Sequence, residues 1–132
     1  MNMKTLHLIM GGSAFVVFLG TGIFMGIRFP EIYGENETIR FLFRANHVYI
    51  LFSSLLNVMA AFSFSMPDKP SKKILYNMGS WLLMISSPLF LAAFIVEPLQ
   101  ASAMRPLTLA GAFACLQGVG FHAISSWRRL IS

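Results

Sequence analysis

The chain has 132 residues, of which 56% are hydrophobic and only 11% are charged, and its net charge is +5. A soluble domain carries about 25% charged residues, so this chain has too few charges to cover a water-facing surface. A water-soluble globular domain is therefore excluded, and so is a disordered chain, which would be far less hydrophobic. One cysteine cannot form a disulfide framework within the chain.

Four apolar stretches are each long enough to cross a bilayer, which takes about 20 residues in a helix. They cover residues 5–26, 41–66, 74–96 and 107–127. The first stretch is interpreted as a true helix, because no small-x-small cleavage site of a signal peptide follows it. Together the four stretches leave no room for a soluble domain, so residues 1–132 are predicted to form a single integral membrane domain.

Short connections join most of these stretches. Pro67 and Pro70 end the second helix, Glu97-Pro98 is expected to end the third, and Pro106 begins the fourth in a position that helices tolerate. Short connections favour antiparallel neighbours. We therefore predict an all-α fold, a four-helix transmembrane bundle of up-down-up-down topology with the first and fourth helices adjacent.

Basic residues predict the orientation in the membrane. Six of the ten Lys and Arg residues lie on the side of the two termini: Lys4, Lys69, Lys72, Lys73, Arg128 and Arg129. Because positive residues accumulate on the cytoplasmic side, both termini are predicted to be cytoplasmic, in a bacterial inner membrane. Such a basic rim facing anionic lipid accounts for the net charge, so no nucleic-acid partner is expected.

Two histidines near the predicted cytoplasmic boundary are candidate ligands. On the first helix, His7 and Gly11 share a face. On the fourth helix, four residues share a face because they recur at every fourth position: Ala110, Ala114, Gly118 and His122. Haem b is the cofactor predicted first, with His7 and His122 as axial ligands to the metal and with Gly11 and Gly118 leaving room for the ring.

The two histidines and the small residues beside them also fit simpler roles. A histidine near a membrane boundary can bond to water, a headgroup or a carbonyl without binding a ligand. A metal ion or a quinone is the other possible ligand of the pair. Stripes of small residues are also typical of plain helix packing in membranes.

A second polar cluster lies at the opposite end of the second helix. Arg44 and His47 share a face with Ser54, and Glu97 is the one acidic residue adjoining a span on that side. An Arg44–Glu97 or His47–Glu97 pair is expected. The cluster is either a polar lock between helices or a site for an anionic group, such as a quinone headgroup or a haem propionate.

The motif Ser86-Ser87-Pro88 lies in the middle of the third helix. Proline removes one backbone hydrogen bond and kinks a helix, and neighbouring hydroxyls can satisfy the freed carbonyls. The motif predicts a local widening of the bundle and favours a cavity near mid-membrane.

The sequence contains no catalytic motif, so whether the protein is an enzyme stays undecided. The leading functional hypothesis is a small membrane protein that binds haem b or quinone between its helices for electron transfer. A second hypothesis is a non-catalytic accessory subunit of a larger membrane complex. A third is a small solute carrier that acts as a homo-oligomer.

Overall fold

The structure is a computed structural model that describes residues 2–63, 66–100 and 104–126, apart from the side chain of Ile32. These residues form four helices and no strand: α1 (Met3–Ile32), α2 (Glu37–Ser63), α3 (Pro70–Gln100) and α4 (Pro106–Ser126). Each helix is long and apolar enough to cross a membrane. The predicted all-α, four-helix membrane fold is confirmed. Residues 64–65 of the second predicted span and Trp127, Arg128 and Arg129 lie outside the described residues.

Local signals explain where the helices begin. The side chain of Asn2 accepts a hydrogen bond from the Lys4 amide (3.3 Å), and that of Asn36 accepts one from the Ile39 amide (3.2 Å). Such caps satisfy amides that have no partner within the helix. Pro70 and Pro106 are the first residues of α3 and α4, where the missing amide costs nothing.

Two helices continue beyond the ends that the sequence predicts. α1 runs on through Pro30 to Ile32, and α3 runs on through Pro98 to Gln100. The expectation that Glu97-Pro98 ends the third helix is therefore wrong. Both prolines lie two residues before the last helical residue, so each removes a hydrogen bond only from a final turn.

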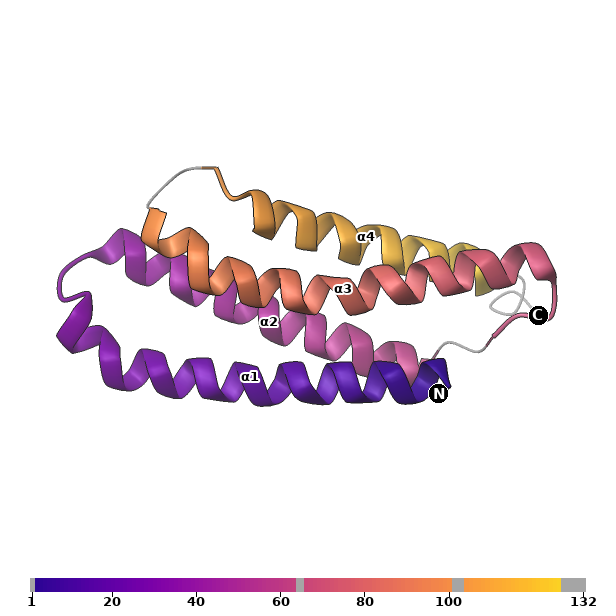
Figure 1. Ribbon diagram of the computed structural model, residues 1–132, viewed down its shortest axis with the longest axis horizontal. Coiled ribbons are helices and arrows are strands. Elements are labelled where there is room, and N and C mark those ends of the chain that lie inside the picture. Colours follow the sequence, from indigo (N-terminus) through magenta and orange to yellow (C-terminus); the bar gives the residue numbers. More distant parts are fainter. Residues whose placement is uncertain (1, 64–65, 101–103, 127–132) are drawn as a thin grey trace.

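The helices run alternately up and down and lie in chain order, with α1 and α4 at the outside and α2 and α3 between them (Figure 1). α1 packs against α2, α2 against α3, and α3 against α4, with smaller contacts of α1 with α3 and of α2 with α4. Within the described residues α1 and α4 do not pack against each other, so the expected adjacency of these two helices is wrong.

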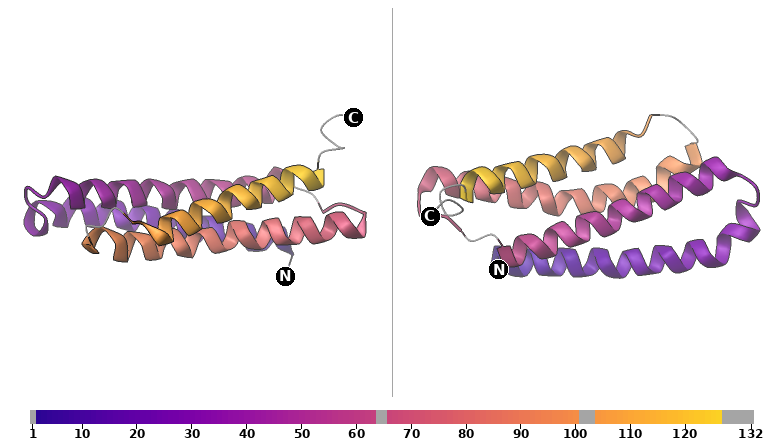
Figure 2. Two further views of the ribbon diagram at one scale, coloured as in Figure 1. Left: turned by 90° about the horizontal axis from the view of Figure 1, so that it is seen from above. Right: turned by 180° about the vertical axis from the view of Figure 1, so that it is seen from behind.

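Glycines explain this pairing of the helices. A Cβ atom added to Gly79 would lie 2.9 Å from the carbonyl oxygen of Gly118, and one added to Gly118 would lie 2.8 Å from Cγ of Leu83. A Cβ atom on Gly11 would likewise lie 2.8 Å from Cγ2 of Val58. Glycines therefore bring α3 close to α4 and α1 close to α2. Two tight hairpins result, and α2 and α3 join them (Figure 2).

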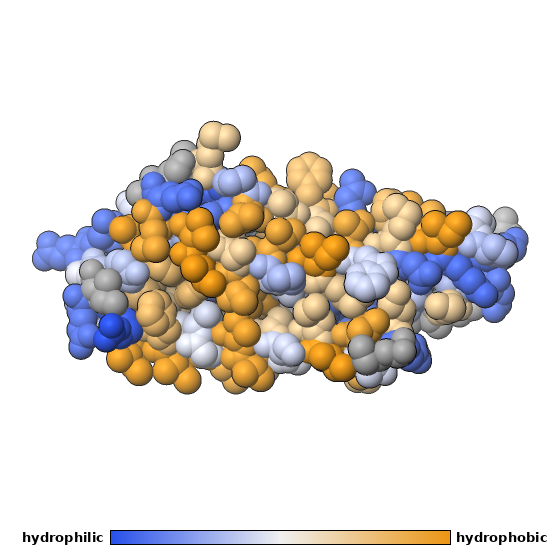
Figure 3. Space-filling view, viewed as in Figure 1, coloured by the Kyte–Doolittle hydropathy of each residue, from blue (hydrophilic) through white to orange (hydrophobic). Residues whose placement is uncertain are grey.

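The surface matches a lipid environment. On the face shown in Figure 3, hydrophobic residues cover most of the middle and hydrophilic residues gather toward the two ends of the long axis. Large apolar side chains of all four helices are exposed, among them Val16, Phe62, Trp81 and Leu116. Exposing these side chains to water would cost free energy, whereas exposing them to the hydrocarbon of a bilayer does not. The chain is an integral membrane protein whose helices contact the bilayer.

Candidate functional site: two polar clusters inside the bundle

Buried polar side chains form two clusters, one toward each end of the bundle. We call the first the histidine cluster and define it by His7, Asn57, Ser80, Ser87 and His122. It lies toward the end where α1 begins and α4 ends. Its five members come from all four helices. Each member is at most 6% exposed, so this cluster is shielded from lipid.

The structure brings His7 and His122 side by side. Their exposed fractions are 1% and 0%, and their ring centroids are 6.2 Å apart with the ring planes tilted by 63°. The two rings meet although α1 and α4 do not pack against each other within the described residues. Side chains therefore span the gap between the two outer helices.

Asn57 determines the orientation of the His7 ring. The Asn57 amide nitrogen donates to the carbonyl oxygens of Ser53 (2.9 Å) and Leu83 (3.0 Å), and it lies 3.3 Å from Oγ of Ser87. Because carbonyl oxygens only accept, the nitrogen of the amide must be on this side. The amide oxygen then accepts from Nδ1 of His7 at 2.8 Å.

This geometry places the His7 proton on Nδ1 and leaves a lone pair on Nε2. Nε2 is buried and has no hydrogen-bond partner among the described residues. A histidine that binds a metal has the same arrangement, in which one ring nitrogen donates to an oxygen and the other faces the metal.

His122 is held by α3. Its Nε2 lies 3.2 Å from Oγ of Ser80, and its ring meets the ring of Tyr76 edge-on, with the centroids 4.9 Å apart. The glycines predicted to leave room for a cofactor ring contact neighbouring helices instead. Gly11 faces Ser54 and Val58 of α2, and Gly118 faces α3. A planar cofactor between the two histidines would therefore need room that these glycines do not supply.

The second cluster lies at the opposite end of the bundle, and we call it the Glu97 cluster. Its members are Asn46, Glu97, Arg105 and Thr108. Glu97 is 2% exposed. Its Oε1 accepts from the backbone amides of Leu107 (2.8 Å) and Thr108 (2.9 Å). A carboxylate of α3 therefore caps the first turn of α4.

Arg105 and Asn46 complete the Glu97 cluster. Nε of Arg105 lies 3.5 Å from Oε2 of Glu97, and the Arg105 guanidinium also donates to Oδ1 of Asn46. The Asn46 amide in turn donates to the carbonyl oxygen of Ala93 (2.9 Å), which ties α2 to α3. Every member is bonded to another element, so the cluster acts as a polar lock between three helices.

The structure corrects the predicted partner of Glu97. Arg105, rather than Arg44 or His47, forms the ion pair with Glu97. Arg44 is exposed and lines a shallow cavity with Pro30. The face of α2 that turns inward instead carries Asn46, which is two positions along from Arg44 and therefore on another side of the helix.

His47 is half-buried and contacts α1. Its Nδ1 lies 2.9 Å from Oγ1 of Thr21, and its ring stacks on Phe18 with the centroids 4.2 Å apart. Gly22 makes room for it, because a Cβ atom there would lie 3.3 Å from Cε1 of His47. His47 is thus separate from both clusters.

Sequence patterns do not single out several residues of these clusters. Ser80, Thr108 and Arg105 are the clearest examples. Their signal is weak, because Ser and Thr occur within many membrane helices and Arg105 resembles an ordinary loop charge. Only Pro106 marks a helix start beside Arg105 and Thr108, and it says nothing of their partners.

Comparison of the chain with protein-family models, with curated proteins and with solved structures yields no match. Its function is therefore inferred from the geometry of the chain itself.

Proposed function

We propose that this chain is a small membrane protein of electron transfer that holds haem b between α1 and α4, with His7 and His122 as axial ligands. The observation that carries the proposal is the buried lone pair on Nε2 of His7, beside a second buried imidazole. Haem supplies a one-electron iron centre when it is bound, and the protein's part is to orient the ligands and exclude water.

Three features support haem binding at this pair of histidines. The first is the absence of a nearby third His, Cys, Asp or Glu that would complete a closed metal site within the described residues. The second is the fixed tautomer of His7, which the Asn57 oxygen maintains. The third is that α1 and α4 do not pack against each other within the described residues, so a flat cofactor between His7 and His122 would displace side chains and not helix backbones.

The experiment is a visible absorption spectrum of the protein purified from membranes in a mild detergent. The expected result is a Soret band with the sharp reduced-state bands of a low-spin haem, at one haem per chain. His7→Ala and His122→Ala are both expected to abolish this spectrum. The chain offers a matched control in its third histidine, since His47 bonds to Thr21. His47→Ala is expected to retain the spectrum.

Two outcomes count against the proposal. A protein without a Soret band that remains folded and free of iron would refute haem binding. A Soret band that survives in both His7→Ala and His122→Ala would show that other residues bind the haem. If the haem-free chain instead purifies at fixed stoichiometry with a larger complex, an accessory subunit is the better explanation.

A further inference from the structure

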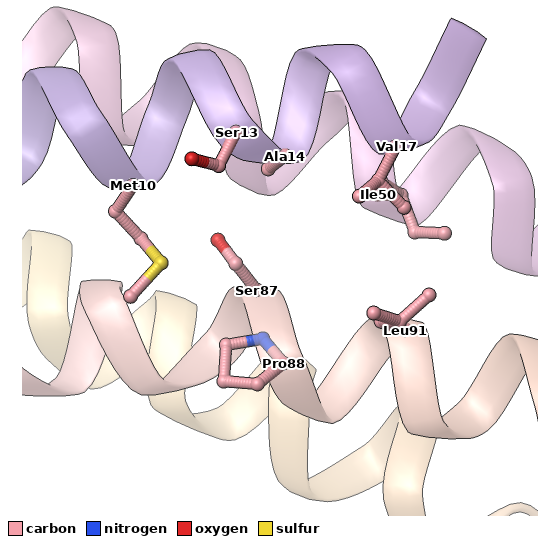
Figure 4. Close-up of a pocket in the computed structure, with 8 residues that line it drawn as sticks. All are labelled: Met10, Ser13, Ala14, Val17, Ile50, Ser87, Pro88 and Leu91. Carbon is pink, nitrogen blue, oxygen red and sulfur yellow. The ribbon is translucent and has the colours of Figure 1, made fainter. Parts of the chain in front are cut away.

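A ring-sized cavity lies between α1 and α3 at the level of Pro88. Its volume is about 160 Å³, and its walls are apolar apart from two hydroxyls, those of Ser13 on α1 and Ser87 on α3 (Figure 4). A neighbouring cavity of about 180 Å³ shares Met10 and Pro88 with it and is also lined by Trp81. The two cavities together form an apolar groove on the lipid side of α1 and α3.

Ser87 connects this groove to the histidine cluster. Nδ1 of His7 donates to the Asn57 oxygen at 2.8 Å, and the Asn57 nitrogen lies 3.3 Å from Oγ of Ser87. In both contacts the donor is on the side of His7. The two amide hydrogens of Asn57 are shared among Ser53, Leu83 and Ser87, and the contact with Ser87 is the longest of the three. Ser87 is 6% exposed, and none of the hydrogen bonds among the described residues has its hydroxyl as the donor.

The Ser87 hydroxyl is a donor at the wall of an apolar groove, and a ligand there can satisfy it with an acceptor. A buried hydroxyl without an acceptor is costly. The oxygen of Ser87 points into the gap between α1 and α3, near Ser13 (Figure 4). The ligand that suits this place is therefore a largely apolar molecule that carries a hydrogen-bond acceptor.

Size and position narrow the choice of ligand. A dry cavity of about 150 Å³ is large enough for benzene, so the cavity at Pro88 fits one six-membered ring. Phospholipid carbonyls lie in the interfacial region of a bilayer, whereas Ser87 is near the middle of α3. A benzoquinone with a hydrocarbon tail has both the ring and the carbonyl acceptor, and it dissolves in the bilayer core.

We propose that the groove between α1 and α3 binds a benzoquinone, with a ring carbonyl accepting from Ser87 and the tail lying past Pro88 toward Trp81. The role of this quinone as an electron partner rests on the proposed haem function, but its binding does not. An acyl chain of a lipid is the competing occupant, and it offers no acceptor to Ser87.

The test is the fluorescence of Trp81 in a Trp127→Phe background, titrated with a benzoquinone that carries a ten-carbon tail. Saturable quenching is expected. Ser87→Ala is expected to weaken binding about tenfold, the loss of one hydrogen bond to the ligand. Ser86→Ala is the matched control, because Ser86 donates to the Leu83 carbonyl and does not line the cavity. It is expected to bind as the parent does.

A second pair of variants tests in which cavity the quinone binds. Ala14→Leu places a larger side chain in the cavity and is expected to abolish saturable quenching. Ala112→Leu makes the same change in a different cavity, between α2 and α4, and is expected to have no effect. His122→Ala is expected to bind the quinone with unchanged affinity, which separates this test from that of haem binding.

Three results would overturn the proposal. Quenching that rises linearly with equal slope in all variants would mean simple partition into the detergent. Equal affinity of Ser87→Ala and Ser86→Ala for the quinone would show that the quinone accepts no hydrogen bond from Ser87. Competition by decylbenzene as strong as that of the quinone would identify the groove as an acyl-chain site.

Discussion

Glu97 offers the sharpest test of how this bundle is held together. Glu97→Gln keeps an oxygen for the Leu107 and Thr108 amides but removes the charge that faces Arg105. Breaking a fully buried ion pair costs about 3–5 kcal/mol. The Arg105 side chain is 20% exposed and sits at a helix start, so we expect a smaller loss of about 2 kcal/mol.

Glu97→Ala goes further, because it also removes the acceptor for the first amides of α4. Loss of a cap typically costs about 1 kcal/mol, which brings the expected loss of unfolding free energy to about 3 kcal/mol. Both variants are measured by reversible unfolding in mixed micelles with a rising fraction of dodecyl sulfate, followed by circular dichroism. The parent chain, measured in the same micelles, is the reference.

A double-mutant cycle identifies the partner of Glu97. Glu97→Gln combined with Arg105→Gln is expected to be less destabilising than the sum of the two single changes. Glu97→Gln combined with Arg44→Gln is expected to be additive, because Arg44 is exposed. Ordinary surface substitutions change the free energy of unfolding by up to about 0.5 kcal/mol. A loss of unfolding free energy this small for Glu97→Ala would contradict a polar lock at this position. So would a stronger coupling with Arg44 than with Arg105.

Two further changes test the packing and the histidine cluster by the same unfolding measurement. Asn57→Ala leaves Nδ1 of His7 without its acceptor and is expected to cost about 2–3 kcal/mol; a neutral result would mean that the amide does not orient the ring. Gly79→Ala is expected to cost about 1–3 kcal/mol, since the added Cβ would lie 2.9 Å from a backbone oxygen of Gly118. Gly120→Ala meets nothing within 4 Å and should be neutral or stabilising by up to about 1 kcal/mol; equal effects of the two would contradict the close α3–α4 contact.

The helices themselves are predictable from the sequence because their signals are local. Length and apolar composition identify the four spans, and prolines mark the starts of α3 and α4. The ends are less predictable. Pro30 and Pro98 resemble helix breakers, yet each lies within a last turn where little is lost.

A local motif in the sequence also predicts the cavity at Pro88. The Ser86-Ser87-Pro88 motif predicts a widening near mid-membrane, and a cavity does lie there, lined by Ser87 and Pro88. What the motif does not reveal is the direction of the hydrogen bonds that lead into it. That direction depends on Asn57 of another helix, whose amide is oriented by the carbonyl oxygens of Ser53 and Leu83.

The effects of hydropathy and of proline are local to one segment of the chain. The amino-acid sequence alone therefore specifies the class of this protein, its four membrane helices and the few polar residues within them. Which of those residues meet depends on how the helices pack in three dimensions. Glycines on α1, α3 and α4 set the pairing of the helices. In that pairing Glu97 lies beside Arg105, and Arg44 is exposed. It also leaves His7 and His122 to meet across the gap between two helices whose backbones stay apart.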